Sequence, residues 1–308
     1  MKVKVSTIAF SKNKLLVEDL LKHFPDAVVN DSGKRMNDGE LIDYFADAEA
    51  VIVGLEIITS ELLDKLPKLR IIAKYGVGLD NIDLDACKNR GILVGWSGGI
   101  NKRSVAEMAL GFMIALCRNL FSTSNELKQF IWNKSGGVQL SGKTIGIIGL
   151  GNIGKELVLL LKPFGCNILV NDIEDVSEFA TANNLQCVDK NTLISLSDIV
   201  SIHTPLTSET RNMFTIKEFK QMKKSTFIIN TARGGIINEL DLKIALKEKI
   251  IAGAALDVYE TEPPIDKELL ELPTIICTPH TGGNAAEAVY AMGESAINHL
   301  IKFRKDGY

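Results

Sequence analysis

Ile145–Gly154 reads Ile-Gly-Ile-Ile-Gly-Leu-Gly-Asn-Ile-Gly. The apolar residues before Gly149 are typical of a buried parallel strand, and Lys155–Leu161 has the pattern of a helix. Gly149, Gly151 and Gly154 have a spacing that permits a tight turn, bare backbone beside a pyrophosphate, and close packing of helix on strand. The N-terminus of that helix offers unpaired N–H groups to an anion. The stretch therefore predicts a phosphate-binding turn.

A carboxylate at the expected distance strengthens this prediction. A second expected strand, Asn167–Asn171, is followed by Asp172, which lies 23 positions after Gly149. The acid that holds the ribose hydroxyls of a dinucleotide is expected about 20 positions after the first glycine. Asp172 would repel the 2′-phosphate of NADP, and no Arg follows it directly. A simple glycine turn is the alternative, but strand, helix and carboxylate together predict a dinucleotide site for NAD in preference to NADP.

Composition narrows the classes of function. The chain has 308 residues, enough for two domains of ordinary size, and 46% of them are apolar. Its net charge of −3, with no basic stripe, argues against nucleic acid or a membrane as a partner. No apolar run is long enough to span a bilayer or to form a signal peptide. The five scattered cysteines form no CxxC pair, so we expect reduced thiols, no metal site and a cytoplasmic location.

Both parts of the chain alternate short apolar runs with amphipathic segments. Expected strands lie at 3–10, 27–30, 50–54, 71–74, 92–94, 199–203, 226–230, 253–257 and 274–277. Expected helices lie at 14–23, 40–45, 60–65, 83–89 and 285–303. This alternation predicts an α/β fold with parallel sheets covered by helices, in which ligands bind at the carboxyl ends of the strands.

One expected helix, residues 104–120, is apolar around most of its circumference. Such a helix needs cover on several sides. We expect it to form a homodimer interface, and burial between two domains is the alternative.

Three side chains that follow expected strands fit a site for carbonyl reduction. Arg233 lies among glycines, where its planar guanidinium could bind a carboxylate through two N–H groups and polarise the adjacent carbonyl. His280 follows a proline at a strand end, and an imidazole exchanges protons near neutral pH. Glu262 could orient that imidazole and keep it available as an acid. Each residue alone is more often structural, but the combination after a dinucleotide unit indicates catalysis.

Further short stretches lie at 75–83 (YGVGLDNID), 104–107 (SVAE), 203–206 (HTPL), 231–235 (TARGG), 257–264 (DVYETEPP) and 278–283 (TPHTGG). Together with 149–154, and in this order, they resemble the D-isomer-specific 2-hydroxyacid dehydrogenase family over nearly the full length. That family includes phosphoglycerate, glycerate and D-lactate dehydrogenases and glyoxylate/hydroxypyruvate reductases.

The resemblance implies two Rossmann/flavodoxin-like domains with parallel sheets. An NAD-binding domain (99–283) would be inserted into a substrate domain (1–98 and 284–308), with the active site in the cleft and dimerisation through the NAD domain. Arg233 would bind the substrate carboxylate together with the backbone of Gly76–Gly78, His280 would be the acid/base, and Glu262 its partner. The implied NAD contacts are Val77, Gly149, Gly151, Asn152, Ile153, Gly154, Asp172, Thr204, Thr231, Ala232, Asp257, Gly282 and Gly283.

The chain departs from the family in places that bear on substrate choice. Trp96-Ser97-Gly98 stands where the family commonly has Asn-Thr-Pro, and Glu56 stands in a loop where enzymes that use 3-phosphoglycerate tend to be basic. Lys74, Lys102 and Arg103 could compensate. The chain ends soon after His280, so we expect no regulatory domain.

The expected reaction is hydride transfer between NAD(H) and a 2-hydroxy acid/2-keto acid pair. Candidate substrates are 3-phosphoglycerate, glycerate or hydroxypyruvate, glyoxylate and D-lactate, with a slight preference for a less charged substrate. The alternative class is an NAD(H)-sensing binding protein of the corepressor type.

Overall fold

The computed structural model describes residues 1–306. The chain folds into two compact units, Met1–Asn101 with Asn284–Tyr308, and Lys102–Gly283. The chain first crosses from one unit to the other between residues 101 and 102, three residues after the boundary expected from the sequence.

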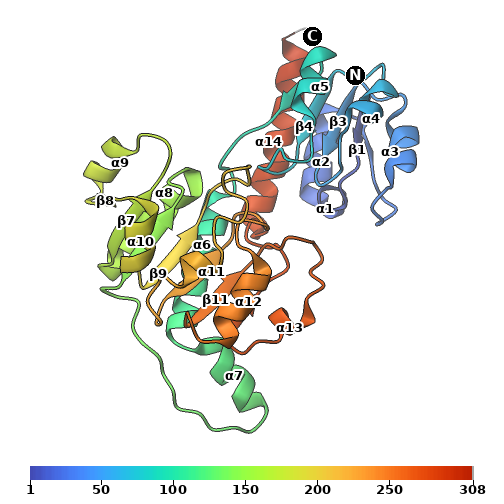
Figure 1. Ribbon diagram of the computed structural model, residues 1–308. Coiled ribbons are helices and arrows are strands. Elements are labelled where there is room, and N and C mark those ends of the chain that lie inside the picture. Colours follow the sequence, from blue (N-terminus) through green and yellow to red (C-terminus); the bar gives the residue numbers. More distant parts are fainter. Residues whose placement is uncertain (307–308) are drawn as a thin grey trace. The chain divides into compact units, whose positions relative to one another are not determined.

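The first unit is a parallel α/β sandwich built from two separate segments of the chain. Its elements are β1 (Val3–Val5), α1 (Ile8–Lys12), α2 (Lys14–His23), β2 (Val28–Val29), α3 (Asp38–Phe45), β3 (Ala50–Val53), α4 (Ser60–Asp64), β4 (Ile71–Lys74), α5 (Leu84–Asn89), β5 (Leu93–Gly95) and α14 (Ala286–Lys305). Within residues 1–306 its sheet has the order β2-β1-β3-β4-β5, which is the flavodoxin-like order. Figure 1 shows the C-terminal helix α14 against β4, although the two are far apart in sequence.

The N-terminal strand is shorter than the sequence indicated. We expected a strand over 3–10, but β1 ends at Val5 and α1 begins at Ile8. A continuous apolar run does not distinguish strand from helix, because its periodicity fits both. Tertiary packing decides, since Phe10 on α1 is fully buried and meets Tyr75 edge-on, with ring centroids 5.9 Å apart.

The second unit is a larger doubly wound domain. Its elements are α6 (Lys102–Cys117), α7 (Leu120–Lys128), β6 (Thr144–Ile148), α8 (Asn152–Leu161), the 3₁₀ helix η1 (Lys162–Phe164), β7 (Asn167–Asn171), α9 (Ser177–Ala182), β8 (Gln186–Cys187), α10 (Lys190–Leu196), β9 (Ile199–Ile202), α11 (Ile216–Phe219), β10 (Phe227–Asn230), α12 (Glu239–Lys247), β11 (Gly253–Leu256), α13 (Lys267–Leu270) and β12 (Ile275–Cys277).

The sheet of the second unit has the order β12-β11-β10-β9-β6-β7-β8 among the described residues, and every neighbouring pair is parallel. The chain starts at β6, winds outward to β8, and then crosses to β9 on the other side of β6. The strand order therefore reverses between β6 and β9. In open α/β sheets, the carboxyl ends of the strands at this reversal form the ligand-binding crevice.

The inward face of the apolar helix α6 is covered by elements of its own unit. Its inward side chains are buried, and the helix packs on α8, β10 and β11. It ends at Cys117 rather than at residue 120, because Asn119 has a left-handed backbone (φ 52°) and a new helix, α7, follows. Figure 1 shows α7 and the loop after it projecting from the sheet of this unit.

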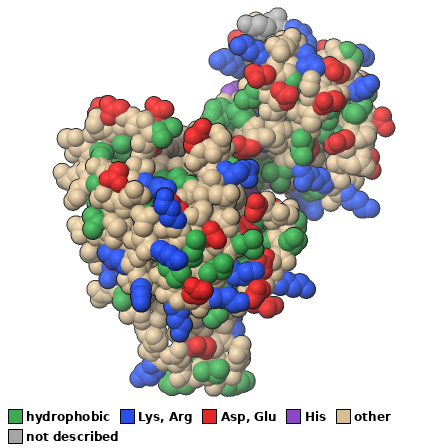
Figure 2. Space-filling view, viewed as in Figure 1, with side chains coloured by type: hydrophobic (Ala, Val, Ile, Leu, Met, Phe, Trp, Pro, Cys, Tyr) green, Lys and Arg blue, Asp and Glu red, His purple; other side chains and the backbone are tan. Residues whose placement is uncertain are grey.

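The surface gives two further observations. Figure 2 shows charged side chains of both signs interspersed on the visible face. Among residues 1–306 no single helix has the length and hydropathy to cross a membrane; only α6 and α7 together reach them, and this pair is bent by 64°.

Candidate active site

The three glycines of the β6–α8 turn meet three different steric demands. Gly149 has a positive φ of 91°, and a Cβ on it would lie 2.7 Å from the carbonyl carbon of His203. A Cβ on Gly154 would lie 2.2 Å from the carbonyl oxygen of Gly149, so this glycine permits close helix–strand packing. A Cβ on Gly151 would meet nothing within 4 Å. The backbone at Gly151 therefore faces open space at the N-terminus of α8, where a pyrophosphate fits.

Asp172 lies directly after β7 and against this turn. One carboxylate oxygen accepts the backbone N–H of Leu150, and the other accepts the N–H of Glu174 at 3.0 Å. The carboxylate is thus held beside the glycine turn, as the ribose-binding acid of a dinucleotide site must be. Asn152 and Ile153 are the first two residues of α8, so their N–H groups belong to the same helix terminus.

Two buried hydroxyls lie at the same sheet edge, at the ends of β9 and β10. Thr204 follows β9 and Thr231 follows β10, and both Oγ1 atoms are buried without a hydrogen bond to any of residues 1–306. A buried polar group without a partner costs about 1–3 kcal/mol, so a pair at one edge indicates a place for ligand atoms. This orphaned pair and the open backbone at Gly151 are the observations that fit a bound dinucleotide.

His203 is a residue that the sequence analysis named only as part of a family stretch. Its Nε2 lies 2.9 Å from Oγ of Ser201, and its Nδ1 has no hydrogen-bond partner in the described part of the chain. Burial lowers the pKa of His203 to about 4. The ring is therefore neutral at physiological pH. Because its backbone also contacts Gly149, His203 lies beside the glycine turn.

The turn after β10 presents Arg233. Asn230, which is buried, accepts the N–H of Ala232 at 3.0 Å and donates to the carbonyl of Arg233 at 2.8 Å. A Cβ on Gly234 would lie 1.8 Å from the carbonyl oxygen of Tyr259, so this turn packs directly on the segment that leads to Glu262. The sequence analysis missed Asn230, although a polar residue at the end of an apolar strand was an available signal.

Glu262 and His280 form a direct pair. Oε2 of Glu262 lies 2.8 Å from Nδ1 of His280, and Oε1 accepts the backbone N–H of Tyr259 at 3.1 Å. The side chains of Glu262 and His280 are 38% and 45% exposed, so substrate-sized molecules can reach the pair. His280 also has a left-handed backbone (φ 54°), which is uncommon outside glycine and clusters at functional sites.

Asp257, which was expected to contact NAD, forms hydrogen bonds to other residues of the protein. It is 1% exposed, and its carboxylate accepts the Thr278 hydroxyl and the N–H groups of Thr281 and Gly282, the latter two at 2.8 and 2.7 Å. Asp257 therefore fixes the loop that carries His280. The predicted residues Gly282 and Gly283 end this loop, and the predicted Ala232 is buried beside Arg233.

Glu239 is a second residue that sequence reasoning missed. Its Oε1 accepts the N–H of Glu260 at 2.6 Å, which anchors the turn carrying Glu262 to the start of α12. Burial raises the pKa of Glu239, and nearby carboxylates, including Glu262, add to the effect. An acidic residue at a helix N-terminus is common, so the sequence alone gave no reason to select it.

The predicted substrate loop Gly76–Gly78 belongs to the first unit and follows β4. Gly76 has a φ of 134°, a conformation that side chains rarely adopt. Val77 packs against the apolar cluster beneath the sheet. The loop is therefore held at one end by a glycine-dependent bend and at its centre by a partly buried side chain.

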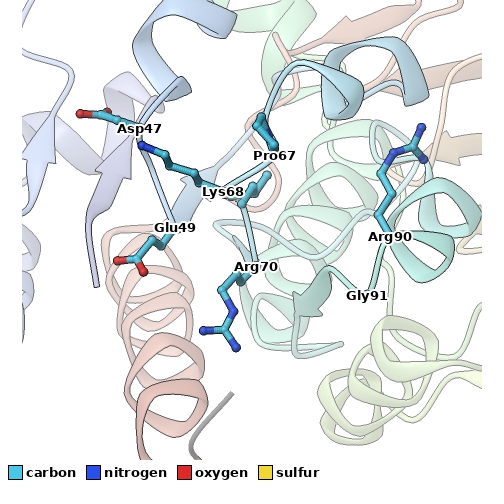
Figure 3. A pocket seen from close by; sticks show the side chains of 8 residues that line it. Asp47, Glu49, Pro67, Lys68, Arg70, Arg90 and Gly91 are labelled. Atoms are coloured by element: carbon cyan, nitrogen blue, oxygen red, sulfur yellow. The ribbon is translucent and has the colours of Figure 1, made fainter.

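A pocket in the first unit lies elsewhere. Its lining residues precede β3, β4 and β5, so it lies at the amino ends of these strands, away from the Gly76–Gly78 loop. In Figure 3, Arg70 and Arg90 point in different directions and do not converge on one point. The Arg90 guanidinium is already paired with Asp64. Among the described residues, no group of three or more potential metal-ligating side chains lies together.

The chain resembles known proteins over nearly its full length. Residues 110–282 match the family model "D-isomer specific 2-hydroxyacid dehydrogenase, NAD binding domain". D-3-phosphoglycerate dehydrogenase of Methanocaldococcus jannaschii is 38% identical over 299 residues, covering 94% of this chain but 57% of that protein. Glyoxylate reductase of Thermococcus litoralis is 36% identical, covering 87% of this chain and 84% of that one.

A solved structure gives the same result. D-lactate dehydrogenase from Aquifex aeolicus, complexed with NAD and lactic acid, has a TM-score of 0.85 at 26% identity and covers 99% of this chain and 96% of its own. The extent of these matches, together with the glycine turn and the Glu262–His280 pair, establishes that this chain belongs to the D-isomer specific 2-hydroxyacid dehydrogenase family.

Proposed function

We propose that this protein is an NAD-dependent D-2-hydroxyacid dehydrogenase that interconverts a 2-keto acid and the corresponding 2-hydroxy acid. The observation that carries the proposal is the 2.8 Å contact between Nδ1 of His280 and Glu262, within the unit that matches the NAD-binding family model. An exposed imidazole held by a carboxylate is the arrangement that a general acid for an alkoxide requires.

The cofactor side of the proposal uses the glycine turn. The N–H groups at the start of α8 would hold the pyrophosphate, and Asp172 would hold the ribose hydroxyls. The buried hydroxyls of Thr204 and Thr231 would form further hydrogen bonds to the dinucleotide. Asp172 is followed by Ile173, Glu174 and Asp175, which supports NAD over NADP because a 2′-phosphate would meet three acids and no base in this segment. When bound, NADH supplies the hydride for the keto carbon.

The residues of the chain then have separate tasks. Arg233 binds the substrate carboxylate through its planar N–H groups and polarises the neighbouring carbonyl. His280 donates its Nε2 proton to the developing alkoxide, while Glu262 accepts the Nδ1 proton in a hydrogen bond and stabilises the imidazolium. We assign the backbone N–H groups of Gly76–Gly78 to the substrate carboxylate. General acid catalysis of this kind supplies about 10²–10⁴-fold in rate.

The loop after β3 favours a substrate without a phosphate. Glu56, which we expected to repel a phosphate from this loop, is buried instead, and its carboxylate accepts the N–H of Gly54 at 2.6 Å. Leu55 and Ile57 are the exposed side chains of the loop. The ammonium of Lys74, a base expected to compensate, is buried and donates to Asn81 at 2.6 Å.

The other expected bases are also engaged. Lys102 and Arg103 pair with Glu156 at 3.5 and 2.9 Å. Arg35, whose guanidinium donates to the carbonyl of Leu55, is a cation that could still bind a phosphate. We therefore favour glyoxylate, hydroxypyruvate or pyruvate over 3-phosphohydroxypyruvate, and Arg35→Gln separates the cases: it would raise the KM for 3-phosphohydroxypyruvate only if that phosphate is bound here.

The decisive experiment is NADH oxidation with 3-phosphohydroxypyruvate, hydroxypyruvate, glyoxylate, pyruvate and branched 2-keto acids. We expect turnover with at least one of them. His280→Ala should reduce kcat by about 10²-fold or more with little change in NADH affinity. Tight NADH binding without turnover of any 2-keto acid would overturn the enzyme assignment and favour the NAD(H)-sensing alternative.

We also propose a homodimer, with its interface centred on α7 rather than on α6, whose inward face packs on α8, β10 and β11. Figure 2 shows apolar side chains at the end of the α7 projection. The exposed apolar residues of this helix and the following loop are Leu120, Phe121, Leu127, Phe130, Ile131, Trp132 and Val138. A cluster of this kind marks an interaction surface. Phe130→Glu should shift the mass measured by light scattering to that of a monomer; a monomeric wild type would contradict the proposal.

The cysteines support a reducing compartment. All five lie within residues 1–306 and none is paired there. We therefore propose a cytoplasmic location, because unpaired thiols persist where glutathione and thioredoxin keep them reduced.

A further inference from the structure

Trp96 follows β5 and contacts the loop to which we assign the substrate carboxylate. Its indole N–H donates to the carbonyl of Val77 at 2.7 Å. Both residues belong to the first unit, so this contact lies within one compact body. The indole is 40% exposed, and therefore part of the ring remains open to solvent beside the loop.

The hydrogen bond between Trp96 and Val77 also orients the N–H group of Gly78. In a trans peptide, the carbonyl of Val77 and the N–H of Gly78 lie in one plane and point in opposite directions. A hydrogen bond that holds the Val77 carbonyl toward Trp96 therefore aims the Gly78 N–H away from Trp96. Gly76 has a φ of 134°, which other residues rarely adopt, and Gly78 has no side chain to restrict its backbone, so a hydrogen bond from outside the loop limits the orientations of the peptide between Val77 and Gly78.

Trp96 is itself held in place by its neighbours. Oγ of Ser97 lies 2.9 Å from Nε2 of His299 and accepts the Ser295 hydroxyl at 3.1 Å. The backbone of Trp96 also forms a hydrogen bond with His299. A Cβ on Gly95 would lie 2.6 Å from Cβ of His299, so the end of β5 packs directly on α14. The indole thus projects from a segment that is fastened to the longest helix of its unit.

We propose that Trp96 is a positioning residue that orients the Val77–Gly78 peptide so that the Gly78 N–H can bind the substrate carboxylate. This inference rests on the proposed function of the same loop. It assigns a role to a residue at which the chain departs from its family. The hydrogen bond is made whether the substrate is in its ground or transition state, and losing it therefore weakens both equally.

The kinetic test uses Trp96→Phe, which keeps an aromatic ring and removes the N–H. We expect the KM for the best 2-keto acid to rise about 3- to 10-fold, as for the loss of one neutral hydrogen bond, with kcat within about twofold. NADH affinity and the thermal midpoint should not change. An unchanged KM would overturn the proposal, as would a parallel loss of kcat, NADH affinity and thermal stability, which would mark a general structural role.

A second measurement does not depend on turnover. The chain has two tryptophans, Trp96 and Trp132, and Trp132 is 78% exposed in the other unit. In a Trp132→Phe background Trp96 is the only tryptophan, and oxamate, a non-reactive 2-keto acid mimic, should change its emission in the NADH-saturated protein. Unchanged emission on addition of oxamate would overturn the proposal. If the wild type reduces no 2-keto acid and oxamate leaves the emission unchanged, the proposed function itself fails; if the wild type reduces a 2-keto acid and the emission is unchanged, only the role of Trp96 fails.

Discussion

Replacing Glu262 by Gln tests the pair on which the acid–base step depends. Glu262 uses both carboxylate oxygens, one for the N–H of Tyr259 at 3.1 Å and the other for Nδ1 of His280 at 2.8 Å. Gln offers one acceptor and one donor in place of two acceptors. Its NH₂ group must face either the Tyr259 N–H, which loses that bond, or Nδ1, which opposes protonation of the ring there.

The size of the effect follows from the exposure of the pair. A hydrogen bond to a charged group contributes about 1.5–3 kcal/mol. Because the two side chains are 38% and 45% exposed, water screens the charge, and the lower part of this range, about 1.5–2 kcal/mol, applies. At about 1.36 kcal/mol for each factor of ten, kcat should fall about 10- to 30-fold.

The assay is the initial rate of NADH oxidation at saturating 2-keto acid, with NADH affinity measured separately by fluorescence. Glu260→Gln is the matched control, because Glu260 is an exposed carboxylate in the same turn. We expect the control to retain its kcat and both variants to retain NADH affinity. A Glu262→Gln enzyme as fast as the wild type, or a control that is equally slow, would refute the reasoning.

Three further predictions concern the NAD-binding unit. Asp172→Ala should weaken NADH binding about 10- to 100-fold and NADPH binding much less, in fluorescence titrations with Glu174→Ala as control; equal losses for both nucleotides would contradict the ribose role. Burial lowers the pKa of His203 to about 4, so the unfolded chain binds this proton below about pH 6.5 and the folded chain only near pH 4. The contribution of His203 to the free energy of unfolding is therefore present at neutral pH and is lost as pH falls. Urea titrations should show a decrease of about 2 kcal/mol between pH 7 and pH 5, and His203→Asn should remove this part of the pH dependence. Gly154→Ala should lower the free energy of unfolding by about 1–3 kcal/mol, because its Cβ would lie 2.2 Å from a carbonyl oxygen. Gly151→Ala should leave the stability unchanged and weaken NADH binding. Equal thermal midpoints for the two variants would contradict this reasoning.

Much of the fold could be predicted from the sequence, because its determinants are local. The glycine spacing at 149–154 sets a turn whose steric demands lie mostly within the turn and its two flanking elements, although a Cβ on Gly149 would also meet the backbone of His203. Strands read from short apolar runs were correct where turn residues bounded them, as at β7 and β10. The predicted end of β1 was wrong because the apolar run continues into α1. Only the burial of Phe10 in the tertiary structure distinguishes the strand from the helix.

The surroundings of α6 show a second limit. Its apolar circumference correctly indicated cover on several sides, but the sequence could not say which elements provide it. In the structure α8, β10 and β11 do so, while the exposed apolar side chains are on α7 and the loop after it. A periodicity reports that a face is buried and carries no information about its partner.

By itself the sequence determined the order of strands and helices, the glycine turn with its following acid, and the residue types available for chemistry. Only the tertiary structure decided that Glu262 meets His280 across 18 positions, that Asp257 fixes the histidine loop, and that Trp96 reaches Val77 across 19. The reason is physical: backbone preferences act over a few neighbouring residues, whereas side-chain pairs between distant segments exist only after the sheets and helices have packed.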